Sequence, residues 1–388
     1  MAQTIAGSNG TQDVEARIFE RLSRVIDPEL GRSVTDLGMI SAIDVSPADA
    51  SDDASDGTSD GVFDVTVHVE LTVPGCPLSE TITNQINGAV SSYPDARLIP
   101  HIEVGSMSRD KLSNLVSELK AERRQNPFSK PGVKTRIFAI ASGKGGVGKS
   151  SVTANLAATF AALGYDTAAI DADIYGFSLP RLFGVHSQPT NLNGMLMPVT
   201  AWGVKLISIG MFAGADRAIL WRGPRLQRSL EQFLSDVWWG EPDVLLLDLA
   251  PGTGDMAISV AQALPNAELV VVTTPQPSAS DIAVRSGLVA LQVPMRVRGV
   301  MENMSYYEHR GERLEIFGSG GGRRVSEQLT HALGYDVPLM AQLPLIPEVR
   351  EVGEAGRPAV LNEQGALDSS PIANEFKTLA TRLMSHVG

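Results

Sequence analysis

A glycine-rich loop between a short apolar run and a helix-forming segment constrains this chain more than any other feature. The run Arg136–Ala141 leads directly into the stretch SGKGGVGKSS, residues 142–151. This stretch fits the pattern G-x-x-x-x-G-K-[ST] in the required context, between a strand and a helix. Glycines let the backbone turn so that several N–H groups point inward, and the following helix N-terminus attracts anions. The sequence therefore predicts a phosphate-binding loop at the end of a buried strand.

Two side chains of this loop carry specific predicted roles. Lys149 is expected to reach the β- and γ-phosphates of a nucleotide, and the Ser150 hydroxyl to ligate magnesium. The full set of predicted nucleotide-binding positions in the loop is Gly143, Lys144, Gly145, Gly146, Val147, Gly148, Lys149, Ser150 and Ser151. The alternative interpretation is a glycine turn with a purely structural role.

Short apolar runs alternate with helical segments after residue 134. The runs are RIFAIAS, TAAIDAD, VKLISIG, DVLLLDLA, ELVVVTT and VRGVMENMS. Strands buried on both faces have this composition, and helices between them imply right-handed βαβ crossovers. The predicted fold is therefore α/β, a P-loop NTPase domain over residues 135–388 with a mostly parallel sheet flanked by helices. The C-terminal stretch EFKTLATRLMSHVG is expected to be the last helix covering that sheet.

Acidic motifs follow the loop at two later strand ends. One contains Asp171 and Asp173, and the other is the apolar run Val244–Leu247 followed by Asp248. The second has the form of a Walker B motif, in which Asp248 holds magnesium through a water. Gly252 lies in the stretch APGTGD, whose glycines suit a loop that senses the γ-phosphate. Each acid alone is also typical of a helix N-cap or a turn, but three motifs in this order favour a nucleotide site.

The stretch KGGVGKS resembles the deviant Walker A motif of a family that includes septum-site, plasmid-partition, nitrogenase-reductase and cluster-carrier ATPases. Six stretches are, in order, similar to the Mrp-type (ApbC-like) ATPases, cytosolic carriers of iron–sulfur clusters. They are SGKGGVGKSS, DADIYGFSLPRLFG, LLLDLAPGTGD, GVMENMSYY, EIFGSGGG and LPLIPEVREVGEAGRP. This resemblance covers about residues 134–388.

The resemblance implies a homodimer with ATP and magnesium at the interface, and slow, dimer-dependent hydrolysis. It implies that Lys144 stabilises transition-state charge in the partner's site, as an arginine finger does. It further implies that Asp173 positions the attacking water, that Asp171 supports the loop, and that Asn303 helps to recognise adenine. The predicted catalytic residues are thus Lys144, Lys149 and Asp173. Lys144 as a solvated loop lysine and Asn303 as a helix cap remain alternatives.

The N-terminal part predicts a small α+β domain over residues 13–107. Apolar positions recur at helical spacing from Val14 to Ile26, with Pro28 as the expected stop. SVTDLGMISAIDV predicts a turn and a strand, residues 64–73 alternate as a half-buried strand, and a helix is expected from about Ser79 to Ser92. IDPELGRSVTDLGMI and LTVPGCPLS are similar to the small domain found in iron–sulfur assembly factors.

Two polar segments flank these predicted elements. The acidic stretch 46–61 is expected to be a solvated loop between strands, and its spacing does not fit an EF-hand calcium site. Residues 108–134 are predicted to form a basic helical linker, with Pro127, Pro131 and Gly132 interrupting it. This linker is either a solvated connector or a docking patch for an acidic partner.

Cys76 is the single cysteine of the chain. It cannot form an intrachain disulfide, which fits a reducing cytoplasm. The family usually carries a Cys-x-x-Cys between the MSY and EIFG motifs, but residues 305–315 contain no cysteine. His309 in that stretch is interpreted as a surface histidine. Cys76, before a predicted helix, is left either as a thiolate that helps to hold a labile iron–sulfur cluster or as a small buried residue.

The formal net charge of −12 argues against general nucleic-acid binding. No apolar run reaches the length of a membrane span, and the first residues show no signal-peptide pattern. The sequence thus predicts a cytoplasmic, ATP-hydrolysing carrier or scaffold that delivers iron–sulfur clusters to client apoproteins, with neither nucleic acid nor membrane as a partner. The alternatives are a spatial or regulatory switch of the septum-site and partition type, and a metal-protein chaperone without its own cluster.

Overall fold

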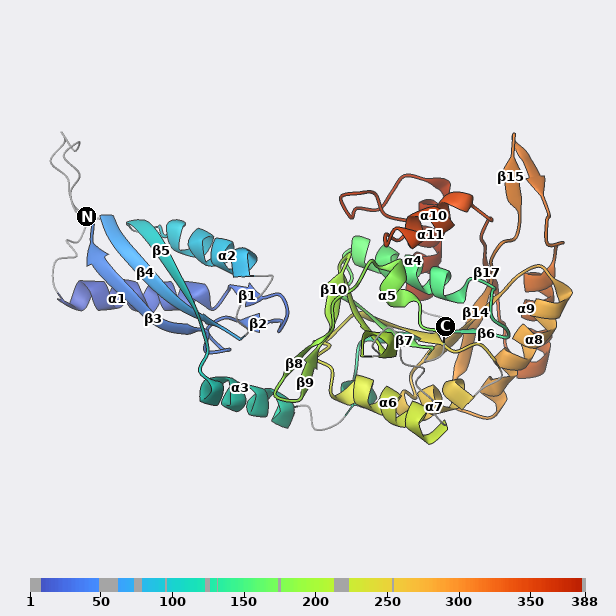
Figure 1. The fold of residues 1–388 in the computed structure, drawn as a ribbon, viewed down its shortest axis with the longest axis horizontal. Coiled ribbons are helices and arrows are strands. Elements are labelled where there is room, and N and C mark those ends of the chain that lie inside the picture. The colour runs from blue at the N-terminus through green and yellow to red at the C-terminus, as the bar shows by residue number, and fades with distance from the viewer. Residues whose placement is uncertain are drawn as a thin grey trace. The chain divides into compact units, whose positions relative to one another are not determined.

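The computed structural model describes residues 8–48, 62–72, 79–94, 96–122, 126–130, 132–173, 176–212, 223–252 and 255–385. The chain divides into two compact units, Met1–Glu122 and Arg123–Gly388. Each unit is built on its own sheet, of three strands in the first and eight in the second (Figure 1). The loop 46–61 and Cys76 fall largely or wholly outside the described residues, so the predictions made for them concern a part of the chain without a structural description.

The N-terminal unit is an α+β layer in which helices cover one face of a three-stranded sheet. The sheet order is β3-β4-β5, with β3 antiparallel and β5 parallel to the central β4. Helix α1 packs against β3, and α2 against β5. The elements are α1 (Ser8–Leu22), β1 (Ile26–Asp27), β2 (Arg32–Ser33), β3 (Ile40–Pro47), β4 (Val62–Leu71), α2 (Ser79–Ser91), β5 (Arg97–Ser106) and α3 (Arg109–Glu122).

Strand β4 confirms the predicted half-buried strand, since Val65, Val67 and Val69 are buried and their neighbours are only half-buried. On the opposite face of the sheet, His68 links its own strand β4 to both neighbouring strands. Its Nε2 lies 2.9 Å from Asp44 Oδ2 on β3, and its Nδ1 lies 3.1 Å from Glu103 Oε2 on β5. The open face of this sheet therefore carries a polar belt rather than a second apolar layer.

The predicted helix from Val14 to Ile26 is wrong at its C-terminal end. Helix α1 ends at Leu22, and Ile26 pairs with Ser33 in a short two-stranded ribbon. The Asp27 carboxylate stabilises this turn, because its Oδ1 accepts hydrogen bonds from the backbone N–H groups of Glu29 and Leu30. Tertiary pairing and side-chain capping thus override the helical spacing, and Ile26 is 45% exposed.

The C-terminal unit contains the predicted mostly parallel sheet. The strand order is β10-β11-β7-β12-β6-β13-β14-β17, and β10 is the one antiparallel member. All six apolar runs singled out in the sequence form strands of this sheet. The strands are β6 (Arg136–Ser142), β7 (Thr167–Ala172), β10 (Val199–Ala201), β11 (Val204–Ser208), β12 (Val244–Leu249), β13 (Glu268–Thr273), β14 (Arg296–Glu302) and β17 (Leu339–Gln342).

Helices, short turns and two hairpins complete this unit (Figure 1). The α-helices are α4 (Lys149–Ala162), α5 (Leu179–Leu182), α6 (Gly223–Ser235), α7 (Asp255–Ala263), α8 (Pro277–Gly287), α9 (Gly321–Leu333), α10 (Pro347–Glu354) and α11 (Pro371–Met384). The 3-10 turns are η1 (Pro127–Ser129), η2 (Ile209–Met211) and η3 (Leu288–Leu291). The hairpins are β8 (Thr190–Leu192) with β9 (Met195–Met197), and β15 (Tyr307–His309) with β16 (Glu312–Leu314).

Each face of the large sheet has its own apolar core. Along β6, Ile137 and Ala139 face the core formed with α6, α7, α8 and α9, whereas Phe138 and Ile140 face the core formed with α4 and α11. Burial on both faces explains the nearly continuous apolar runs in the sequence. The predicted C-terminal helix is confirmed as α11, with Phe376 buried against the sheet. No helix in the described ranges is both long and apolar enough to cross a membrane.

Candidate functional site

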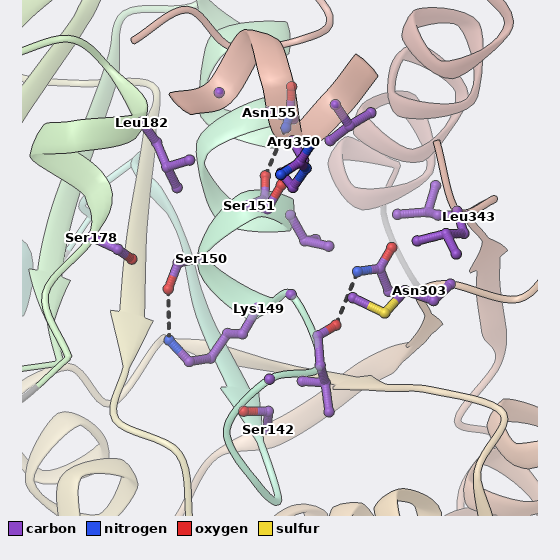
Figure 2. A pocket seen from close by; sticks show the side chains of 18 of the residues that line it. Ser142, Lys149, Ser150, Ser151, Asn155, Ser178, Leu182, Asn303, Leu343 and Arg350 are labelled. Carbon is purple, nitrogen blue, oxygen red and sulfur yellow. Dashed lines mark hydrogen bonds between the residues drawn. The ribbon is translucent and has the colours of Figure 1, made fainter. Parts of the chain in front are cut away.

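The glycine-rich loop lies at the carboxyl end of β6 and enters a cavity of about 710 Å³. Figure 2 shows the loop together with the start of α4 along one wall of this cavity. The predicted positions that line it are Lys144, Gly145, Gly146, Val147, Gly148, Lys149, Ser150 and Ser151. Open α/β sheets bind ligands at this edge, beyond the carboxyl ends of their strands. The loop and its cavity thus lie where the motif predicts a phosphate site.

Three positions of the loop require glycine, two because of their backbone conformation and one because of close packing. Gly146 and Gly148 have φ angles of +82° and +81°, a region that side chains disfavour. Gly143 does not line the cavity. A Cβ on Gly143 would lie 2.4 Å from the backbone carbon of Ile282, so this glycine lets the loop pack closely against α8. Gly143, one of the predicted nucleotide-binding glycines, therefore has a packing role in the structure.

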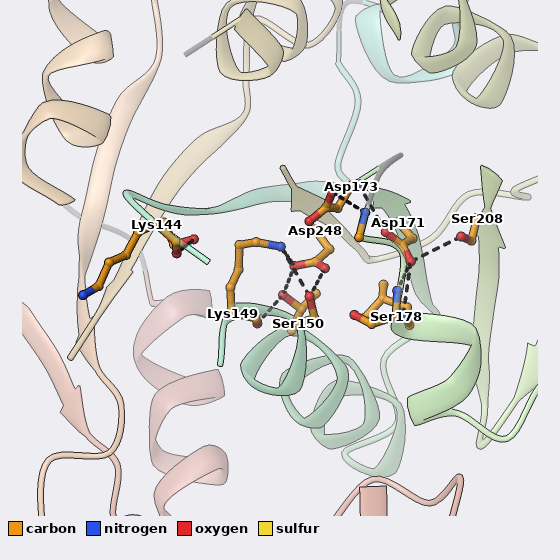
Figure 3. A network of polar contacts seen from close by, with 12 residues as sticks. Lys144, Lys149, Ser150, Asp171, Asp173, Ser178, Ser208 and Asp248 are labelled. Atoms are coloured by element: carbon orange, nitrogen blue, oxygen red, sulfur yellow. Dashed lines mark hydrogen bonds and ion pairs between the residues drawn. The ribbon is translucent and has the colours of Figure 1, made fainter. Parts of the chain in front are cut away.

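Asp248 is the centre of a buried polar network at the base of the cavity (Figure 3). Lys149 Nζ donates to its Oδ1 at 2.7 Å, and the Ser150 hydroxyl donates to its Oδ2 at 2.5 Å. The Thr153 hydroxyl, one helical turn after Lys149, donates to Oδ1 at 2.9 Å. The structure brings together Lys149, Ser150 and Asp248, which the sequence assigned to one site, and adds Thr153, which the sequence did not single out. The available signal was its position four residues after the lysine on the same helix face.

Asp171 is fully buried beside Asp248 on the neighbouring strand β7. Its carboxylate accepts hydrogen bonds from the backbone N–H groups of Asp173, Ser178 and Leu179, and from the Ser208 hydroxyl. Burial, and next the negative charge of Asp248, raise the pKa of Asp171 to about 7. These contacts hold the backbone at Asp173, Ser178 and Leu179.

Asp173 lies at the rim of the same cavity. Its Oδ1 accepts a hydrogen bond from the Gly176 N–H at 2.9 Å, and the side chain is buried. Across the cavity Pro251 is part of the lining. Gly252 is not, and its N–H donates to the Ser142 carbonyl at 2.9 Å. Asp173 and Gly252 thus follow the neighbouring strands β7 and β12, and β12 pairs with β6, which carries the loop.

Lys144 is directed away from Lys149. Figure 3 shows its side chain extending away from Lys149, and its Nζ donates to the Ser278 hydroxyl at 3.0 Å, at the start of α8. The residue is half-buried and belongs to the lining of the cavity. The lysine therefore does not approach Lys149 of its own loop.

Asn303 follows β14 and lies between two strands rather than at a helix start. Its Nδ2 donates to the Val147 carbonyl at 2.9 Å (Figure 2). Beyond it the cavity becomes apolar. This end is formed by residues that lie in the family stretches but were given no role in the site, namely Met304, Leu343, Pro344, Leu345, Ile346 and Val349. An apolar slot beside a phosphate loop is suited to a flat aromatic base.

Residues 305–315, where the family carries two cysteines, form the β15–β16 hairpin. His309 stacks on Tyr307 and is exposed, as expected of a surface histidine. Arg310 and Gly311, with φ angles of +53° and +81°, make the turn. Among the residues that the structure describes, no group of three or more His, Cys, Asp or Glu side chains is arranged to hold a metal ion.

Comparison with known families decides the affiliation of the chain. Residues 133–384 match the ParA family, described as NUBPL iron-transfer P-loop NTPase. The chain belongs to this iron-transfer NTPase family. Residues 15–54 also match a family described as iron-sulfur cluster assembly protein. Membership in the iron-transfer NTPase family confirms the resemblance that the sequence motifs indicated.

Curated iron-sulfur cluster carrier proteins match the chain over nearly its whole length. The iron-sulfur cluster carrier protein of Mycobacterium tuberculosis is 45% identical over 382 residues, which is 97% of this chain and 95% of the relative. The protein of the same name from Deinococcus radiodurans is 36% identical over 370 residues, 94% of this chain and 95% of the relative. Both parts of the chain therefore have counterparts in carrier proteins.

Solved structures also match the C-terminal part. One is a nucleotide-binding protein from Archaeoglobus fulgidus in complex with ADP, 31% identical, with a TM-score of 0.49, covering 62% of this chain and 92% of that one. Another is the septum site-determining protein MinD of Pyrococcus horikoshii with Mg-ADP, 24% identical, with a TM-score of 0.46, covering 64% of this chain and 96% of that one.

Proposed function

We propose that this protein is a cytoplasmic iron–sulfur cluster carrier that binds and hydrolyses ATP with magnesium and delivers clusters to client apoproteins. One observation carries the proposal: Lys149, Ser150 and Asp248 converge at a glycine loop in a chain that is 45% identical to a curated cluster carrier over 97% of its length. Family membership favours the carrier over the spatial or regulatory switch. We divide the chain into a small domain, residues 13–107, a basic linker, residues 108–134, and an ATPase domain, residues 135–388.

The hydrogen-bond donors and oxygen ligands that line the cavity suit a magnesium nucleotide. The backbone of residues 144–148 offers N–H groups, and Lys149 offers a cation that exchanges Asp248 for phosphate oxygens. The Ser150 hydroxyl and the Asp248 carboxylate, already in contact, are hard oxygen donors of the kind that Mg²⁺ prefers. Magnesium supplies charge neutralisation on the phosphates. Asn303 and the apolar end of the cavity receive the adenine.

Hydrolysis requires a residue that orients water and a cation that stabilises the developing charge. Asp173, at the cavity rim, is the proposed water-positioning residue. Lys144 is the proposed stabilising cation, supplied to the partner site of a homodimer with ATP at its interface. Its direction away from Lys149 supports a role outside its own site. Because the site is complete only in the dimer, slow turnover that depends on dimerisation is expected.

The cluster is the cargo, and the chain offers one cysteine, Cys76, as a thiolate ligand. Two chains then supply two thiolates, and small thiols or the client complete the coordination. Such a cluster is labile, which suits transfer. The residues 305–315 of this chain lack the usual two cysteines, which favours one second candidate, a metal-protein chaperone that uses ATP but holds no cluster itself.

Anaerobic reconstitution with iron and sulfide separates these two functions. The wild type is expected to take up a cluster, seen by its visible absorption, and to pass it to an apo-ferredoxin when ATP is present. Cys76→Ala is expected to lose uptake while keeping ATPase activity, and the variant Cys76→Ser is the isosteric control. Equal uptake by wild type and Cys76→Ala removes Cys76 from the mechanism. Failure of the wild type to take up a cluster, with ATPase intact, selects the chaperone.

A further inference from the structure

The side chain of Asn303 is bonded to the backbone of the phosphate loop. Its Nδ2 lies 2.9 Å from the Val147 carbonyl oxygen, and its own backbone N–H donates to the Thr273 carbonyl at 2.8 Å. Since a carbonyl accepts only from the amide nitrogen, this contact fixes which way the Asn303 amide faces. Figure 2 shows the amide between the loop and the apolar end of the cavity. Asn303 therefore connects strands β13 and β14 to the loop.

This contact fixes the orientation of one peptide group in the loop. In a trans peptide the C=O of Val147 and the N–H of Gly148 point in opposite directions. Because Asn303 holds the Val147 carbonyl on its side of the loop, the Gly148 N–H points away from Asn303, back into the loop. The same peptide ends at Gly148, the N-cap of α4, where backbone N–H groups bind anions.

Two further features show that the chain is built around this contact. A Cβ on Gly148 would lie 2.2 Å from Asn303 Nδ2, so the asparagine approaches only because residue 148 is a glycine. Immediately after Asn303, Met304 adopts a φ of +55°, a value that residues other than glycine rarely adopt. Backbone strain of this kind persists where the surroundings enforce it, and it clusters at functional sites.

We propose that Asn303 is a positioning residue for the phosphate-binding end of the site. It orients the Gly148 N–H toward the phosphates, whatever it contributes to base recognition. This proposal rests on the proposed nucleotide-binding function and deepens it. Asn303 thereby couples the two ends of the cavity, because one side chain borders the base slot and also sets a donor of the phosphate loop.

Magnesium tripolyphosphate, which has phosphates but no base, tests this role. Its affinity and that of Mg-ATP are measured by calorimetry for the wild type, Asn303→Ala and Asn303→Asp. The matched control is Val349→Ala, at the apolar end of the cavity. Loss of this half-buried hydrogen bond at the loop is expected to weaken tripolyphosphate binding by about tenfold in both Asn303 variants. Val349→Ala is expected to weaken ATP binding alone.

The tripolyphosphate and ATP affinities are measured on the same preparation and compared as a ratio. A fraction of unfolded protein therefore affects both measurements equally. Unchanged tripolyphosphate affinity in both Asn303 variants, with weaker ATP binding, overturns the proposal and leaves Asn303 as a base contact. Asn303 variants that do not fold at all also overturn it, since the residue then serves the fold. A wild type that binds neither ligand contradicts the proposed function instead.

Discussion

Lys149 and Asp248 form a buried ion pair at the base of the cavity, with 2.7 Å between Nζ and Oδ1 and side chains that are 6% and 0% exposed. The pair joins the first residue of α4 to the strand β12. Asp248 also accepts from Ser150 and Thr153, so a single carboxylate organises the lysine and the two hydroxyls. The lysine that is expected to bind phosphate is therefore also the counter-ion of the expected magnesium ligand.

Replacing Lys149 by methionine is expected to abolish ATP binding and turnover and to destabilise the protein. Removing one partner of a buried pair leaves an uncompensated charge and costs about 3–5 kcal/mol. Urea unfolding and a phosphate-release assay measure the two effects. The double variant Lys149→Met with Asp248→Asn is expected to recover most of the stability but no activity. A single variant as stable as the wild type would show that the ion pair contributes little.

Lys144→Ala is expected to bind ATP with nearly wild-type affinity and to lose hydrolysis, because the lysine acts on charge that develops in the partner's site. Fluorescent-nucleotide binding and steady-state phosphate release distinguish the two steps. Ser278→Ala, which removes only the hydroxyl that holds Lys144 Nζ, is the control and should retain turnover. Full hydrolysis by Lys144→Ala would sink the in-trans role.

Asp171 makes stability depend on pH in a direction set by its raised pKa, about 7 in the folded chain. The folded state holds this proton more tightly than the unfolded state, whose carboxyl has a pKa of about 3.9. The resulting stabilisation is fully present below that lower value and is lost as pH rises through 7. Against Asp171→Asn, the wild type is expected to lose free energy of unfolding between pH 5 and pH 8. A constant difference across that range contradicts the raised pKa.

Arg298→Met is expected to loosen the end of α11 and lower the free energy of unfolding by about 2–3 kcal/mol. Its guanidinium donates to the carbonyls of Arg382, Leu383 and Ser385, the groups that a helix C-terminus leaves without partners. Arg296→Met, an exposed arginine two residues earlier on β14, is the control and should cost little. The thermal unfolding midpoints of the two variants are compared directly. Equal midpoints would contradict the capping role of Arg298.

The N-terminal unit shows why local pattern alone misplaced a helix end. The spacing from Val14 to Ile26 continues a helical stripe, yet the chain leaves the helix at Leu22. The Asp27 turn and the pairing of Ile26 with Ser33 involve contacts that helical periodicity does not encode. The sequence likewise assigned no role to Thr153 or to Ile346 at the apolar end of the cavity, because only the folded chain brings them to the site.

The sequence by itself determined the parallel sheet and the place of the loop, because doubly buried strands and the G-x-x-x-x-G-K-[ST] pattern are local chemistry. It also placed Asp248 and Asp171 at strand ends, and the structure shows that their strands are neighbours. Only the tertiary structure decided that Lys149 pairs with Asp248, that Lys144 rests on Ser278, and that Asn303 holds the loop at Val147. These contacts join residues 99, 134 and 156 positions apart, so packing sets them and local sequence does not.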